Sequence, residues 1–104
     1  MSAIVQDRIT IPMQELAELC RRYYVRELSL FGSVLRDDFR DDSDIDVLVV
    51  FEPGAPIGLF EYVRLQHEMS DLIGRQVDLV EKSGLKQFLR DEVLESARVI
   101  YAAR

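Results

Sequence analysis

Apolar side chains recur with the period of an amphipathic helix in three parts of the 104-residue chain. The predicted helices cover residues 12–24, 59–73 and 85–97. Pro12 is tolerated in the first turn of a helix, and Gly74 is well placed to end the second helix. Tyr24 and Leu59 fall on the apolar stripes, so we expect both side chains to face the core.

Short apolar runs between these helices predict strands. The predicted strands cover residues 27–31, 45–51 and 76–81, with a short edge segment at 98–101. Both faces of the run 45–51 are apolar beyond its second residue, as in a strand that is buried on both sides. The alternating order of helices and strands predicts an α/β (α+β) fold.

A Gly-Ser pair, Gly32 and Ser33, follows the first predicted strand. Gly lacks a Cβ atom, so the backbone can turn sharply there and a ligand can approach the N–H groups. We expect Ser33 to open a short helical turn and to cap it with its hydroxyl. Such a turn suits a phosphate, although the same dipeptide occurs in many turns without function.

Asp44 and Asp46 lie at the start of the strand 45–51, where alternation places both side chains on one face. A carboxylate entering a buried strand is costly, and two on one face repel each other. A Mg²⁺ ion would relieve both problems. The alternative is one solvated acidic loop that includes Asp44. This explanation holds for the four carboxylates that precede Asp44, but it fails for Asp46, which Ile45 and Val47 flank. The loop carboxylates are Asp37, Asp38, Asp41 and Asp42.

Asp78 lies within the strand-like run 77–80. Taken alone, it is best explained as an edge-strand residue that faces water. Taken with Asp44 and Asp46, it becomes the third carboxylate of a two-metal site. Two metal ions about 3.5–4 Å apart stabilise the attacking and leaving oxygens of an in-line displacement. A carboxylate beside the attacking hydroxyl can also accept its proton.

Gly32-Ser33, ten intervening residues, Asp44-x-Asp46 and the later Asp78 resemble the signature of the DNA polymerase beta-type nucleotidyltransferase superfamily. The likeness covers about residues 28–80, and the compact chain is similar to the minimal nucleotidyltransferase (MNT) domains of prokaryotes. The resemblance implies a polymerase beta-like fold, with a small mixed sheet flanked by helices and residues 1–104 as a single domain.

The same resemblance implies roles for these residues toward ATP and Mg²⁺. Gly32 and Ser33 would hold the triphosphate, Asp44 and Asp46 would hold two Mg²⁺ ions, and Asp78 would bind one of the ions. Arg36 matches a basic residue that often follows the Gly-Ser turn and contacts phosphate. Many members have Gly after this Arg, where this chain has Asp37. A salt bridge from Arg36 to the nearby acidic residues accounts for it equally well.

The net charge of −6 and the pI of about 4.7 restrict the possible partners. Proteins that bind nucleic acids usually carry a basic stripe, and the basic residues here are scattered. We therefore expect no direct nucleic-acid binding, and a basic protein partner fits better. No apolar run is long enough to span a membrane, and Cys20 is the single cysteine, so a cytoplasmic protein is expected.

Similarity to minimal domains also implies a partner, because larger enzymes of the superfamily add a second domain and this chain is too short for one. MNT domains are often paired with a HEPN-type ribonuclease in toxin–antitoxin systems. There the nucleotidyltransferase is the antitoxin and transfers AMP from ATP to a tyrosine hydroxyl of the toxin, within a hetero-oligomer. Two alternatives stay open. One is a non-catalytic antitoxin that neutralises the toxin by binding, and the other is a nucleotidyltransferase acting on a small molecule.

Overall fold

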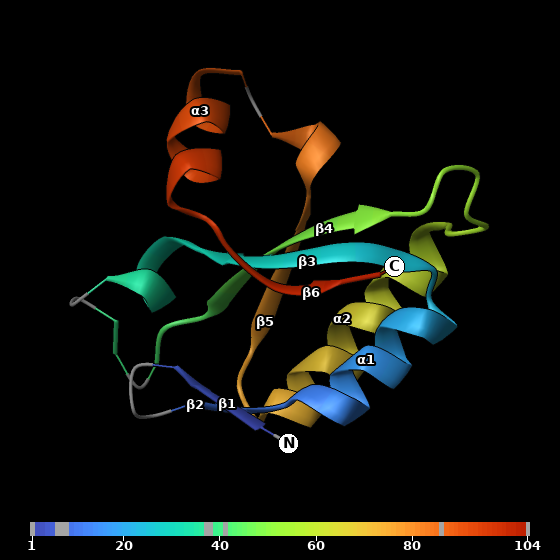
Figure 1. Cartoon of the computed structure of the whole chain (residues 1–104), viewed down its shortest axis with the longest axis horizontal. Coiled ribbons are helices and arrows are strands. Elements are labelled where there is room, and N and C mark those ends of the chain that lie inside the picture. The colour runs from blue at the N-terminus through green and yellow to red at the C-terminus, as the bar shows by residue number, and fades with distance from the viewer. Residues whose placement is uncertain (1, 6–8, 37–38, 41, 86, 104) are drawn as a thin grey trace.

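The computed structural model describes residues 2–5, 9–36, 39–40, 42–85 and 87–103 (Figure 1). The helices in these ranges are α1 (Met13–Arg22), α2 (Leu59–Ile73) and α3 (Gln87–Ser96). The strands are β1 (Ser2–Val5), β2 (Ile9–Pro12), β3 (Val25–Phe31), β4 (Ile45–Phe51), β5 (Val77–Glu81) and β6 (Arg98–Ala102). The alternation of helices and strands from α1 onward confirms the predicted α/β class.

Four strands form a mixed sheet in the order β5-β4-β3-β6. β3 runs antiparallel to both β4 and β6, whereas β4 and β5 are parallel. Parallel neighbours cannot be joined by a tight turn, so α2 provides the crossover between β4 and β5. The small mixed sheet flanked by helices is the arrangement that the resemblance implied.

α1 and α2 lie side by side against one face of the sheet, and α3 stands on the other side (Figure 1). Leu30 of β3 and Val47 of β4 are paired in register, so their side chains share the face that the two helices cover. The core lies between this face and the helices. Its completely buried side chains include Leu16, Leu28, Leu30, Val47, Leu65 and Met69.

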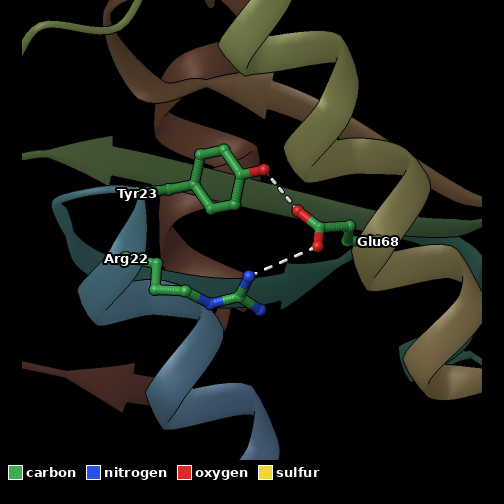
Figure 2. A network of polar contacts seen from close by, with 3 residues as sticks. All are labelled: Arg22, Tyr23 and Glu68. Atoms are coloured by element: carbon green, nitrogen blue, oxygen red, sulfur yellow. Dashed lines mark hydrogen bonds and ion pairs between the residues drawn. The ribbon is translucent and has the colours of Figure 1, made fainter.

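A polar contact joins the end of α1 to the middle of α2, as Figure 2 shows. The Tyr23 hydroxyl donates a hydrogen bond to Glu68, and Arg22 Nη1 lies 3.4 Å from the other carboxylate oxygen of Glu68. Burial raises the pKa of the Tyr23 hydroxyl, and the adjoining Glu68 carboxylate raises it further. The Tyr23 ring is buried, as predicted for a core residue.

Both ends of α1 differ from the prediction, and α3 (Gln87–Ser96) is shorter than the predicted helix 85–97. Pro12 is the last residue of β2 and precedes α1, because its extended backbone (ψ 94°) still belongs to the strand. Tyr24 was expected in the core but is 49% exposed, because α1 ends at Arg22 and Tyr24 adopts a positive φ of 58°. Gly74 ends α2 as predicted, in a left-handed conformation with φ 78°.

The antiparallel pair β1–β2 was not predicted. β2 carries the alternating sequence Ile-Thr-Ile-Pro, in which Ile9 and Ile11 are buried and Thr10 is exposed. A strand of four residues is too short for its alternation to stand out from chance.

None of the helices in the described part of the chain is long and apolar enough to cross a membrane.

Candidate active site

The Gly32 turn directly adjoins Asp46. Phe31, the last residue of β3, is paired with Asp46 of β4, so the chain turns at Gly32 immediately beside this carboxylate. Gly32 has φ 76°, a left-handed conformation that disfavours other residues. A Cβ atom at Gly32 would overlap the Asp46 carboxylate oxygen and lie 3.2 Å from its Cγ. The conformation therefore favours glycine here, and any larger residue would force the Asp46 carboxylate to shift.

Ser33 belongs to a single 3₁₀ turn, Gly32–Leu35. The expected capping by its hydroxyl is wrong, because the turn begins at Gly32 and has no side-chain cap. The contribution of Ser33 to the turn is its carbonyl, which accepts a hydrogen bond of 2.9 Å from the N–H of Arg36. The Ser33 side chain is half-buried and forms part of the surface next to Gly32.

Asp46 and Asp78 occupy matching positions on the parallel strands β4 and β5. Pairing in register places their side chains on the same face of the sheet, opposite α1 and α2. Asp46 is half-buried and Asp78 is exposed. Asp44 is exposed and immediately precedes β4. The structure thus brings Asp46 between a neighbour in sequence, Asp44, and a neighbour across the sheet, Asp78.

The electrostatics of Asp46 reflect this position. Burial raises the pKa of the Asp46 carboxyl, and the charges of Asp78 and Asp44 raise it further, while Arg36 acts in the opposite direction. Each of these groups is therefore close enough to influence Asp46. The ionised form of Asp46 is disfavoured because burial and the two neighbouring carboxylates together outweigh the positive charge of Arg36.

Three carboxylates around one position are the hard oxygen donors that Mg²⁺ prefers. The raised pKa of Asp46 fits such an ion, because a divalent cation would offset the repulsion. Among the described residues, however, no three Asp, Glu, His or Cys side chains already converge in a geometry that could hold a metal ion. Asp37, Asp38 and Asp41 of the expected acidic loop lie outside the described residues, and Asp42 is exposed.

A pocket of about 300 Å³ opens where the Gly32 turn meets Asp46. Arg36 lines it, so Arg36 adjoins both the turn and the carboxylate. The wall on the far side comes from α3, through Glu92, Val93 and Ser96. This wall was missed by the sequence reasoning, because exposed glutamates on a short helix carry no signal of a site.

Comparisons with known proteins identify the family of the chain. Residues 13–100 match the family model described as the nucleotidyltransferase domain. The chain is similar to the protein adenylyltransferase MntA of Thermococcus cleftensis, with 42% identity over 84 residues that cover 81% of each protein. It is also similar to a solved structure described as a minimal nucleotidyltransferase, with 39% identity and a TM-score of 0.68, covering 82% of this chain and 85% of that one.

A more distant structure shares the fold. It is the Shewanella oneidensis complex of a tri-AMPylated HEPN toxin with an MNT antitoxin. The identity is 18% and the TM-score 0.62, with 88% of this chain and 70% of the other covered. The family model spans most of the chain and contains the Gly32 turn, Asp46 and Asp78. The chain therefore belongs to the nucleotidyltransferase domain family and is a minimal nucleotidyltransferase with a polymerase beta-like fold.

Proposed function

We propose that this chain is a Mg²⁺-dependent protein adenylyltransferase that acts as an antitoxin. It transfers AMP from ATP to a tyrosine hydroxyl of a HEPN-type toxin, with which it forms a hetero-oligomer. One observation carries the proposal: the Gly32 turn lies directly against Asp46, which is in register with Asp78. The name of the T. cleftensis relative and the composition of the S. oneidensis complex support the choice of reaction and partner.

The triphosphate of ATP lies at the Gly32 turn in this proposal. Gly32 and Ser33 present backbone N–H groups and a hydroxyl to the β- and γ-phosphates, and glycine allows close approach. The Arg36 guanidinium lines the same pocket and supplies positive charge for a phosphate oxygen. The pocket of about 300 Å³ bounded by α3 is where the phosphates enter.

Asp44, Asp46 and Asp78 are the residues that would hold Mg²⁺. When bound, the metal supplies charge neutralisation at the reacting phosphate and positions the reacting groups. Asp46 supports this role because burial raises its pKa and repulsion from Asp78 and Asp44 raises it further, a penalty that a divalent cation would offset.

The acceptor hydroxyl oxygen attacks the α-phosphorus, and the bond from that phosphorus to the oxygen bridging to the β-phosphate breaks, which releases pyrophosphate. Asp78 is the exposed member of the β4–β5 pair, so it is the carboxylate that a protein acceptor can reach. It takes the proton of the attacking hydroxyl.

Co-expression with the HEPN-type partner tests the proposal. The partner is purified and its intact mass is measured, with the Asp44→Asn, Asp46→Asn double variant and the partner alone as controls. A gain of one or more AMP units only with the unmutated chain is the expected result. An unchanged mass with tight co-purification would instead make this chain a binding-only antitoxin. No change and no complex would redirect the search to small-molecule acceptors.

A further inference from the structure

Large apolar side chains are exposed at the start of α2. Leu59 is 77% exposed, Phe60 is 82% exposed and Val63 is 41% exposed. They occupy the first turns of one helix, and Val63 follows Leu59 by four residues, which places these two on the same helix face. Isolated apolar residues are common on protein surfaces, but a contiguous exposed group marks an interaction site.

A pocket of about 450 Å³ adjoins this group. Its lining residues are Ile57, Gly58, Leu59, Tyr62 and Glu81. The wall formed by Tyr62 is fixed, because its hydroxyl donates a hydrogen bond of 2.6 Å to the carbonyl of Leu79. The Tyr62 ring also packs against the ring of Phe51, with the centroids 6.3 Å apart. The pocket is therefore preformed for an apolar side chain of a partner.

The charge at this pocket is negative. Glu81 is the charged residue among those that line it. A second carboxylate lies at its rim, because Glu61 Oε1 accepts a hydrogen bond of 2.8 Å from the N–H of Gly58. A second copy of this chain would bring carboxylates against carboxylates and a further net charge of −6. A partner that carries basic groups beside its apolar side chain is complementary.

We propose that Leu59, Phe60, Val63 and the adjoining pocket form an α2 docking surface for the protein acceptor, which presents an apolar segment flanked by basic residues. The inference rests on the proposed function. The docking surface is displaced along the sheet from the carboxylates, since the pocket residue Glu81 is three residues beyond Asp78 on β5, or roughly 10 Å of extended chain. The side chains of this surface therefore bind the acceptor beside the carboxylates and do not take part in the transfer step.

The test is the triple variant Leu59→Ser, Phe60→Ser, Val63→Ser, assayed with purified HEPN-type acceptor over a range of concentrations at saturating ATP and Mg²⁺. Val99→Ser is the matched control, because Val99 is a 54% exposed apolar residue on β6. We expect the triple variant to raise the KM for the acceptor about tenfold or more and to leave kcat within about twofold. Glu81→Gln is expected to raise KM less, with an effect that disappears at about 0.5 M salt.

Several outcomes would overturn the docking surface. They are an unchanged KM in the triple variant, an equal effect of Val99→Ser, or a solution dimer of the unmutated chain that the triple variant abolishes. Failure of the proposed function is a separate result, in which the unmutated chain transfers no AMP at all. Binding of the same partner is then measured by calorimetry, and equal affinity of the triple variant and the unmutated chain would overturn the docking surface independently.

Discussion

Asp46 and Asp78 occupy matching positions on two parallel strands, so two carboxylates share one face of the sheet. Neighbouring like charges are unfavourable in a folded protein unless a ligand offsets them. Burial raises the pKa of the Asp46 carboxyl, and repulsion from Asp78 and Asp44 raises it further. The Asp46–Asp78 pair therefore destabilises the folded protein, and a bound cation would remove this destabilisation.

Removal of one charge from this pair is expected to stabilise the metal-free protein at neutral pH. Because the folded-state pKa of Asp46 is raised above the ordinary 3.8, folding favours its protonated form. The stability that protonated Asp46 contributes to the fold is fully present below pH 3.8 and is lost as the pH rises through the folded-state pKa of Asp46. Asp46→Asn should therefore unfold at higher denaturant than the unmutated protein at pH 7, with the advantage shrinking toward pH 3.8. Urea titrations with a chelator at several pH values measure this, and equal midpoints at pH 7 would contradict it.

Mg²⁺ is expected to make the unmutated protein more stable than the variants that lack these carboxylates. A ligand that binds only the folded state adds about 2.7 kcal/mol at one hundred times its dissociation constant. Mg²⁺ should raise the melting temperature of the unmutated protein and have little effect on the Asp44→Asn, Asp46→Asn double variant. Thermal melts with and without Mg²⁺ give the comparison, and K⁺ at equal ionic strength controls for screening. An equal Mg²⁺ response of the double variant would argue against these ligands.

Gly32→Ala is expected to abolish AMP transfer and to destabilise the fold. Gly54→Ala is the matched control, because Gly54 has nearly the same φ, 75° against 76°, but no atom within 4 Å of a Cβ. The control carries only the backbone strain, about 1 kcal/mol, whereas Gly32→Ala adds a collision with Asp46. Denaturant unfolding and transfer assays of both variants separate the two effects. Equal loss in both would mean that the contact with Asp46 is unimportant.

Tyr23→Phe is expected to lower the free energy of unfolding by about 1–2 kcal/mol without changing AMP transfer. The ring keeps its packing, and only the hydrogen bond to Glu68 is lost. The raised pKa of Tyr23 gives a second signature. The stability that the protonated Tyr23 hydroxyl contributes to the fold is present below pH 10.0 and is lost as the pH rises through its folded-state pKa. The stability difference between Tyr23→Phe and the unmutated protein should therefore narrow in alkaline solution. Urea unfolding near pH 8 and above pH 10 measures the change, and a constant difference would contradict the assignment.

Strand and helix patterns in the middle of the chain were sufficient to predict both β4 and α2 with their observed bounds. A continuous apolar run defines β4, and helical periodicity with a terminal glycine, Gly74, defines α2, so local sequence is enough to place both. Leu59 was misplaced for a tertiary reason, since helical spacing predicts a stripe but not where the core ends. Tyr24 was misplaced for a local reason, since α1 ends at Arg22. The hairpin β1–β2 was too short to detect.

The carboxylates and the Gly-Ser turn of the site came from local spacing, and the structure brings Gly32, Asp46 and Asp78 to neighbouring positions. Arg36 joins them by lining the same pocket. The wall from α3 was beyond the reach of local patterns. Glu92 and Ser96 approach Gly32 only because β6 returns the chain to β3, and such a long-range contact leaves no spacing in the sequence.

The lengths of β4 and α2 have a consequence for the carboxylate pair. β4 carries the chain forward by seven residues, about 23 Å, and α2 returns it by fifteen residues, about 22 Å. These two lengths are nearly equal and opposite in direction, so the first residues of β4 and β5 are paired and Asp78 lies beside Asp46. The length of the crossover helix therefore sets the alignment of Asp46 and Asp78. An insertion or deletion within α2 would shift β5 along β4 and move Asp78 away from Asp46. We therefore expect members of the family to conserve the length of this helix as strictly as the aspartates themselves.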